Sequence, residues 1–152
     1  MSRNRRKSKG RRESGPFIAV PIAVIESKEY AALRASEVKL IIDLHAQYRG
    51  FNNGDLQLTW GEMSNRGWAS RETLDNARRR LLERGFIILT RQGGRHCPSL
   101  YALSYLPINE CGGKLDVSST PVAPATWRAR SVPRDPCQID PKVGPMMGKQ
   151  GG

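Results

Sequence analysis

Residues 70–88 read SRETLDNARRRLLERGFII and contain the pattern that decides the fold. The apolar positions of this stretch have the three- and four-residue spacing of one helix face: Leu74, Ala77, Leu81 and Leu82. Ser70 directly precedes them and predicts an N-cap, because its hydroxyl can accept a hydrogen bond from a free amide of the first turn. Gly85 can adopt the left-handed conformation that ends a helix. The stretch therefore predicts a capped amphipathic helix with arginines on its outer face.

A second, short helix and a tight turn are predicted just before this one. Thr59 is followed three residues later by Glu62, which is the spacing of a capping box, so we expect a helix from Thr59 to Arg66. The turn between the two helices is Gly67-Trp68-Ala69. Leu56-Gln57-Leu58 alternates in polarity, as a short strand does.

A longer helix is expected earlier in the chain, where Ser36 can cap it and Gly50 can end it. Its apolar positions spread over more than one face, which predicts a central place in the core: Val38, Leu40, Ile41, Ile42, Leu44, His45 and Tyr48. We interpret His45 as a core or edge histidine. Residues 17–33 predict one or two helical turns leading into the domain.

Two segments after Gly85 are rich in apolar and aromatic residues, residues 86–90 (FIILT) and 100–106 (LYALSYL). The intervening residues 91–99 centre on two glycines and predict a turn, so the segments form an antiparallel hairpin. The expected fold class is α+β, with a three-helix core, a short strand and a C-terminal β-hairpin.

This order of elements resembles the winged helix-turn-helix family over roughly residues 36–106. The closest local match, Ser70-Arg71-Glu72-Thr73-Leu74-Asp75-Asn76-Ala77, is similar to the recognition helix of bacterial winged-helix regulators. The chain also resembles small helix-turn-helix proteins of plasmids and prophages. The resemblance implies double-stranded DNA binding in transcription regulation or replication initiation. Gly67 and Trp68 differ from the usual turn residues, and Arg78 replaces a frequent leucine, which bears on the angle between the two helices.

The resemblance implies a recognition helix in the major groove and a wing at residues 91–97. Arginine pairs with guanine, asparagine with adenine and glutamate with cytosine, and the free amides after the cap can face a phosphate. The expected contacts at the start of the helix are Ser70, Arg71, Glu72, Thr73 and Asn76. Farther along, Arg79 and Arg80 are expected to hold phosphates. Arg91 and Arg95 flank Gly93-Gly94, so they can approach the minor groove or a flanking phosphate.

The charge distribution also favours a polyanionic partner. The formal net charge is +11, and residues 1–13 contain seven lysines and arginines against one acid. Residues 66–95 contain eight arginines against three acids. A basic arm adds affinity by releasing counterions from phosphates, here through Arg3, Arg5, Arg6 and Lys7.

Gly, Pro and charged residues gather at the two ends of the chain. We therefore expect a disordered basic arm at residues 1–15, a winged helix-turn-helix domain at residues 16–110 and a disordered tail at residues 111–152. Trp60 and Trp68 are interpreted as packing residues. Trp127, in the predicted tail, suggests a short anchor for a partner protein.

Other function classes find little support in the sequence. Cys97, Cys111 and Cys137 are odd in number and lack CxxC spacing, which fits a reducing compartment, so we expect a cytoplasmic protein. A zinc site would need ligands from the predicted tail, and we expect no metal and no cofactor. No nucleophile, base and orienting group can be assembled, so we expect no enzyme. The apolar stretch at residues 17–25 is too short to span a bilayer, and no membrane partner is expected.

Two alternatives stay open for a small basic domain. One is an RNA-binding or ribosome-associated protein, which exposed aromatic residues on a sheet would favour. The other is a winged helix used only for protein contacts. A homodimer or a protein partner is also compatible with the sequence.

Overall fold

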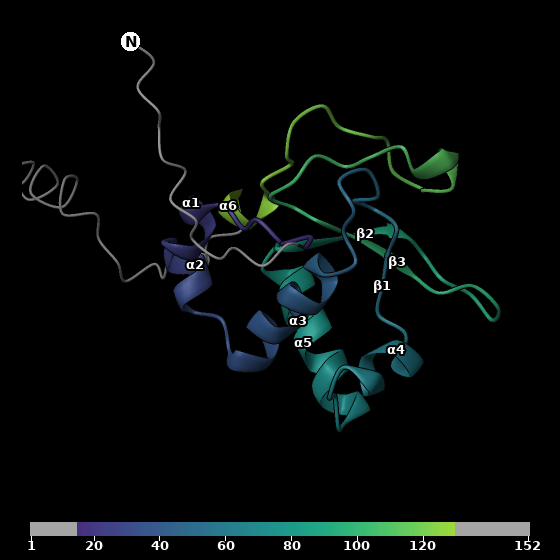
Figure 1. Ribbon diagram of the computed structural model, residues 1–152, viewed down its shortest axis with the longest axis horizontal. Helices are drawn as coiled ribbons and strands as arrows, with labels where there is room; N and C mark the ends of the chain where they lie inside the picture. The colour runs from purple at the N-terminus through teal and green to yellow at the C-terminus, as the bar shows by residue number, and fades with distance from the viewer. Residues whose placement is uncertain (1–14, 130–152) are drawn as a thin grey trace, which may run out of the picture.

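The computed structural model describes residues 15–129, and within them the chain folds into six α-helices and a three-stranded antiparallel sheet (Figure 1). The helices are α1 (Ile22–Ile25), α2 (Lys28–Ala31), α3 (Ala35–His45), α4 (Trp60–Asn65), α5 (Arg71–Glu83) and α6 (Thr126–Ala129), with a short 3-10 helix, η1, at Cys111–Gly113. The predicted α+β class is confirmed. The predictions for residues 1–14 and 130–152 lie outside the described residues.

The two long helices, α3 and α5, pack on each other and form the helical part of the core. From α3 come Leu40, Ile41 and Leu44. The predicted apolar stripe of α5 is buried, except that Leu82 is only half-buried: Leu74, Ala77, Leu81 and Leu82. The small side chain of Ala77 is almost fully buried, which allows close approach of the two helices.

The N-caps predicted from the sequence are only partly confirmed. Ser70 caps α5 as predicted, since its Oγ accepts a 3.3 Å hydrogen bond from the Thr73 amide. The prediction that Ser36 caps α3 is wrong, because the N-cap is Arg34. The Glu37 carboxylate accepts a 3.0 Å hydrogen bond from the Arg34 amide. Thr59 is the N-cap of α4, but its side chain accepts no hydrogen bond, so the expected capping box is not formed.

The long helix α3 also ends earlier than Gly50. After His45 the amides of Gln47 and Tyr48 bond to carbonyls three residues back, so the chain tightens into turns before the glycine. His45 is buried, as interpreted, and its Nδ1 lies 3.0 Å from the hydroxyl of Tyr105 in a hydrogen bond.

The sheet has the order β1-β3-β2, so the last strand lies in the middle. Its strands are β1 (Leu56–Gln57), β2 (Ile87–Arg91) and β3 (Leu100–Leu103). The predicted hairpin is the β2–β3 pair, although β3 ends before Leu106 because the chain turns back there, with the Leu106 amide bonded to the Leu103 carbonyl. A register shift between Leu89 and Arg91 turns Thr90 inward, and its hydroxyl donates to the Gly54 carbonyl at 2.6 Å.

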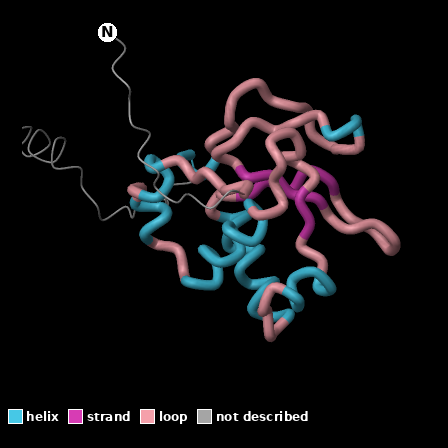
Figure 2. Tube along the Cα trace, in the orientation of Figure 1, coloured by secondary structure: helices cyan, strands magenta, loops and turns pink. Residues whose placement is uncertain are grey.

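The ordered domain continues past residue 110, so the predicted boundary is wrong for residues 111–129. Trp127 is only 4% exposed and stacks on Phe86, with 6.0 Å between ring centroids. Its interpretation as a short anchor for a partner protein is therefore wrong as well, because the ring is packed in the core of this chain. The Thr126 hydroxyl donates to the Gly85 carbonyl, and a Cβ at Gly85 would lie 2.5 Å from the Thr126 carbonyl oxygen. Figure 2 shows that loops make up most of this closing segment between β3 and α6.

Candidate nucleic-acid interface

The first turns of α5 bring the predicted base-contacting residues together. Arg71, Glu72, Thr73 and Asn76 are all exposed. Glu72 and Asn76 lie opposite the buried stripe of the helix, and Arg71 and Thr73 flank it. Glu72 and Asn76 are one turn apart, so they lie on the same line along the helix surface. The Ser70 cap uses one amide of the first turn and leaves this end of the helix exposed to solvent.

Trp60, at the start of α4, contributes to this surface and was not predicted to do so. Its ring centroid lies 5.3 Å from the guanidinium carbon of Arg71. A cation–π contact of this kind contributes about 0.5–1 kcal/mol at an exposed site and restricts the arginine to fewer rotamers. No signal in the sequence pairs these two residues, because the contact joins the starts of two different helices.

The turn between α4 and α5 is held by Asp43, a buried carboxylate in α3. Its Oδ2 accepts hydrogen bonds of 2.8 Å from the Trp68 indole and of 2.8 Å from the Lys39 ammonium group. The same ammonium group donates to the Arg66 carbonyl at 2.8 Å, and the Arg66 guanidinium lies 3.9 Å from Asp43 Oδ1. Trp68 is only 6% exposed, which confirms its interpretation as a packing residue.

Arg79 and Arg80 are adjacent in sequence but face different surroundings. Arg79 is exposed, as a phosphate-binding residue requires. Arg80 points toward α3, and its guanidinium lies 3.5 Å from the carboxylate of Glu37, which is fully buried. Arg84 lies 4.0 Å from the same carboxylate. Arg80 is thus already paired within the fold, and we remove it from the predicted phosphate contacts.

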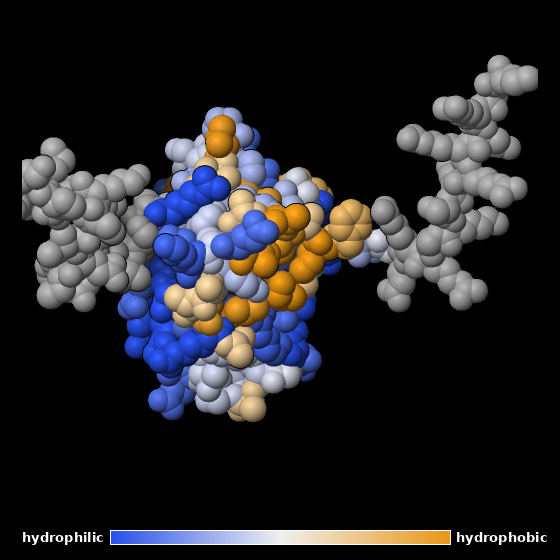
Figure 3. All heavy atoms as spheres, turned by 90° about the vertical axis from the view of Figure 1, so that its left-hand side faces the viewer, coloured by the Kyte–Doolittle hydropathy of each residue, from blue (hydrophilic) through white to orange (hydrophobic). Residues whose placement is uncertain are grey.

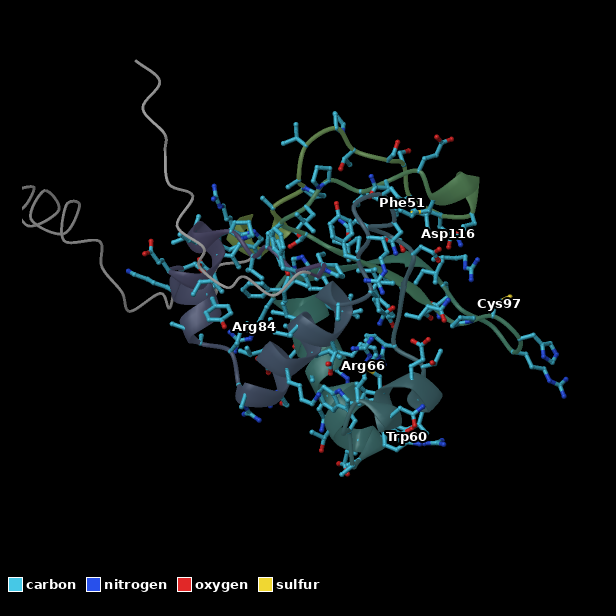
Figure 4. All side chains as sticks on the ribbon, in the orientation of Figure 1. Phe51, Trp60, Arg66, Arg84, Cys97 and Asp116 are labelled. Carbon is cyan, nitrogen blue, oxygen red and sulfur yellow. The ribbon has the colours of Figure 1, made fainter. Side chains whose placement is uncertain are left out.

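Arg84 and Trp60 mark the two ends of the α4–α5 region in Figure 4. Arg78 of α5 extends toward the sheet. Its guanidinium lies 3.3 Å from Asp75 and within 3.4 Å of the Tyr101 hydroxyl on β3. The residue that replaces a frequent leucine therefore connects α5 to the central strand.

The hairpin tip projects from the body of the molecule, with Cys97 near its end (Figure 4). Its shape depends on Gly93, where a Cβ would lie 2.5 Å from the Ser99 amide nitrogen, and Gly94 bridges to Cys97 across the tip. Arg95 is exposed there. Arg91 is instead half-buried at the base and donates to the Pro98 carbonyl at 3.3 Å. Of the two predicted wing arginines, only Arg95 is free to reach a ligand.

Within residues 15–129, no group of three or more His, Cys, Asp or Glu side chains is arranged to hold a metal ion. Burial raises the pKa of the Cys111 thiol and lowers the pKa of His45, so both groups favour the neutral form. The predicted arm residues lie outside the described part of the chain: Arg3, Arg5, Arg6 and Lys7. No helix among the described residues is long and apolar enough to cross a membrane.

Comparison with known proteins found no match to a protein-family model, a curated protein or a solved structure.

Proposed function

We propose that this chain binds double-stranded DNA as a winged helix-turn-helix protein, with α5 in the major groove and residues 91–97 as the wing. The observation that supports this best is the presentation of the start of α5. Its inner face is seated in the core, and its entry turn is hydrogen-bonded to α3 through Asp43. Base recognition requires a recognition helix that is held rigidly in this way.

The arrangement of elements supports the proposal. The order α3-β1-α4-α5-β2-β3, with β3 central in the sheet, resembles a winged helix. In Figure 1 the α4–α5 turn and the hairpin tip both project away from α1 and α2. Both elements can therefore contact one duplex, with α5 in its groove and Arg95 beside it.

Four exposed side chains support a proposed set of contacts. We assign base edges to Arg71 and Asn76 and phosphates to Arg79 and Arg95, because all four are exposed to solvent. The sequence of the arm supplies further positive charge, which increases affinity without selecting a base sequence. Transcription regulation and replication initiation are both compatible with this proposal.

RNA binding through the sheet is less well supported. An RNA-binding sheet stacks bases on exposed aromatic rings, whereas Tyr101 and Tyr105 are buried. No aromatic ring of the described strands is exposed on the sheet.

The proposal is tested by salt titrations of binding to random-sequence duplex DNA, single-stranded DNA and structured RNA, all with the full chain. We expect a preference for duplex DNA that the Arg71→Ala, Asn76→Ala double variant loses. Arg79→Ala should reduce the slope of log affinity against log salt by about one, as expected for one lost phosphate contact. Lys28→Ala is the matched control, because it also removes one positive charge, from an exposed position in α2. It should retain the preference for duplex DNA.

A double variant that binds duplex DNA like the wild type would overturn the role of α5. Tighter binding to RNA would replace the proposal with the RNA-binding alternative. A variant in which Arg3, Arg5, Arg6 and Lys7 are all glutamine separates the arm from the domain. If that variant binds nothing, the arm alone carries the affinity and the proposed site is wrong.

A further inference from the structure

Eight arginines lie between residues 66 and 95, so positive charge alone does not identify the side chain that recognises a base. Hydrophilic side chains are likewise spread over the lower part of the face in Figure 3, at the level of α3 and α5 in Figure 1. The arginines differ in how the fold uses their guanidinium groups. Five of these groups form ion pairs or hydrogen bonds within the fold: those of Arg66, Arg78, Arg80, Arg84 and Arg91.

The remaining three arginines are Arg71, Arg79 and Arg95, and all three are exposed. Within residues 15–129, their guanidinium groups form no hydrogen bond or ion pair with the chain. Arg71 differs from the other two because it lies over the ring of Trp60, 5.3 Å from the ring centroid. The fold therefore restricts the Arg71 side chain and still leaves all its N–H donors available to a ligand.

The Trp60 ring is itself held by the fold. It is half-buried and packs against the hydrophobic core, and its backbone begins α4. The first turn of α4 is fixed as well, since the fully buried Met63 donates its amide to the Thr59 carbonyl at 3.0 Å. A ring that the core holds in place can restrict the guanidinium group that lies over it.

We propose that Trp60 is a positioning residue that holds Arg71 in the orientation for binding a guanine in the major groove. This inference rests on the proposed binding of duplex DNA by α5. Guanine presents two neighbouring acceptors there, O6 and N7, and the planar fork of an arginine can bind both at once. A contact of this kind requires one orientation of the side chain. Restricting the side chain before binding lowers the entropic cost of that contact, so it favours guanine over other bases.

The test begins with selection of duplex DNA from a random-sequence library by the full chain. Each guanine of the selected site is then replaced, one at a time, by deazaguanine, which lacks the N7 acceptor. We expect one of these replacements to lower the affinity about tenfold. Inosine at the same position retains O6 and N7 and lacks only the minor-groove amino group, so it should bind like guanine. The ratio of the affinities for the guanine and deazaguanine sites measures the discrimination.

Substitutions at Trp60 and Arg71 assign this discrimination to the pair. Trp60→Leu should lower the affinity ratio about threefold, because it removes the ring face without changing the charge. Trp60→Phe retains an aromatic face and should keep most of the ratio, whereas Arg71→Ala should bring it close to one. Phe51→Leu is the matched control and should keep the wild-type ratio, because Phe51 is an exposed aromatic residue far from Trp60 (Figure 4).

Nuclear magnetic resonance of the chain without DNA gives a second readout that does not depend on the proposed function. The ring current of Trp60 should shift the side-chain methylene protons of Arg71 upfield in the wild type, and Trp60→Leu should abolish this shift. Methylene shifts equal to those of a free arginine would overturn the positioning role.

The binding results separate failure of this inference from failure of the proposed function. A ratio that Trp60→Leu leaves unchanged overturns the inference. Equal loss of affinity for both sites also overturns it, since Trp60 would then have only a structural role. If no guanine is sensitive to deazaguanine, the guanine assignment is wrong although duplex binding stands. A wild type that binds no duplex DNA overturns the proposed function itself, and the guanine assignment with it.

Discussion

The indole Nε1 of Trp68 donates a 2.8 Å hydrogen bond to Oδ2 of Asp43, which joins the turn before α5 to the body of α3. Trp68 stands where the winged-helix resemblance implies a turn glycine, and the preceding Gly67 adopts a φ of 89°. The left-handed residue is thus one position earlier than the resemblance implies, and the bulky Trp68 is buried and anchored. The Asp43–Trp68 bond therefore helps to set how α5 leaves the turn.

Replacing Asp43 with alanine should lower the free energy of unfolding by about 2–3 kcal/mol, because a buried indole N–H loses its charged acceptor. Urea unfolding followed by circular dichroism measures this. Asp75→Ala is the control, since that carboxylate pairs with Arg78 at the surface and its loss should cost less than about 1 kcal/mol. Equal losses in the two variants would mean that the Asp43 bonds contribute no more than a surface ion pair.

Trp127 should be a stabilising core residue in spite of its place near the end of the described chain. Trp127→Ala removes the ring that stacks on Phe86 and should cost about 3–5 kcal/mol, measured by urea unfolding. Val122→Ala, an exposed position in the same closing segment, should change the free energy by less than about 0.5 kcal/mol. If Trp127→Ala is as stable as the wild type, the domain ends earlier than the structure indicates.

Substitution of Asn53 should destabilise the protein more than substitution of most other polar residues. Asn53 is fully buried. Its Nδ2 donates hydrogen bonds to the carbonyls of Leu103 and Pro107, at 3.0 and 2.9 Å. Its Oδ1 accepts a 2.8 Å hydrogen bond from the Leu103 amide. Asn53→Leu leaves these backbone groups unpaired and should cost about 3 kcal/mol or more in thermal unfolding. Asn65→Ala, at an exposed position, is the comparison. A tolerated Asn53→Leu would show that the β3 end forms without this side chain.

Acid should destabilise the protein through His45. Burial lowers the pKa of His45 below its ordinary value of 6.5, so the unfolded chain takes up a proton at a pH where the folded chain does not. The stabilisation is therefore complete above pH 6.5 and is lost as the pH falls toward the lower pKa of the folded state. Urea unfolding at several pH values between neutral and mildly acidic measures the loss, which is at most about 1.4 kcal/mol per pH unit.

The matched variants separate His45 from the other titrating groups. His45→Gln should flatten this part of the pH dependence, whereas His96→Gln, at an exposed position, should leave it unchanged. A pH dependence that survives His45→Gln would assign the effect to the carboxylates instead.

Local sequence patterns were enough to predict the elements near residues 56–106. The Ser70 cap, the apolar spacing from Leu74 to Leu81 and the glycine-centred hairpin depend on interactions within a few residues, so they can be read in the chain. The exposure of Arg71 and Asn76 follows from the same periodicity, because positions off the apolar stripe face solvent.

The tertiary structure decided what depends on partners far apart in the sequence. Arg80 is paired with Glu37, Trp68 is bonded to Asp43, and Trp127 packs on Phe86, at separations from 25 to 43 residues. No local pattern predicts such pairs, because the free energy of a buried charge or ring depends on the groups that folding brings beside it. The sequence by itself determined the capped helix and the hairpin, and only the packing decided which of their arginines stay free and where the domain ends.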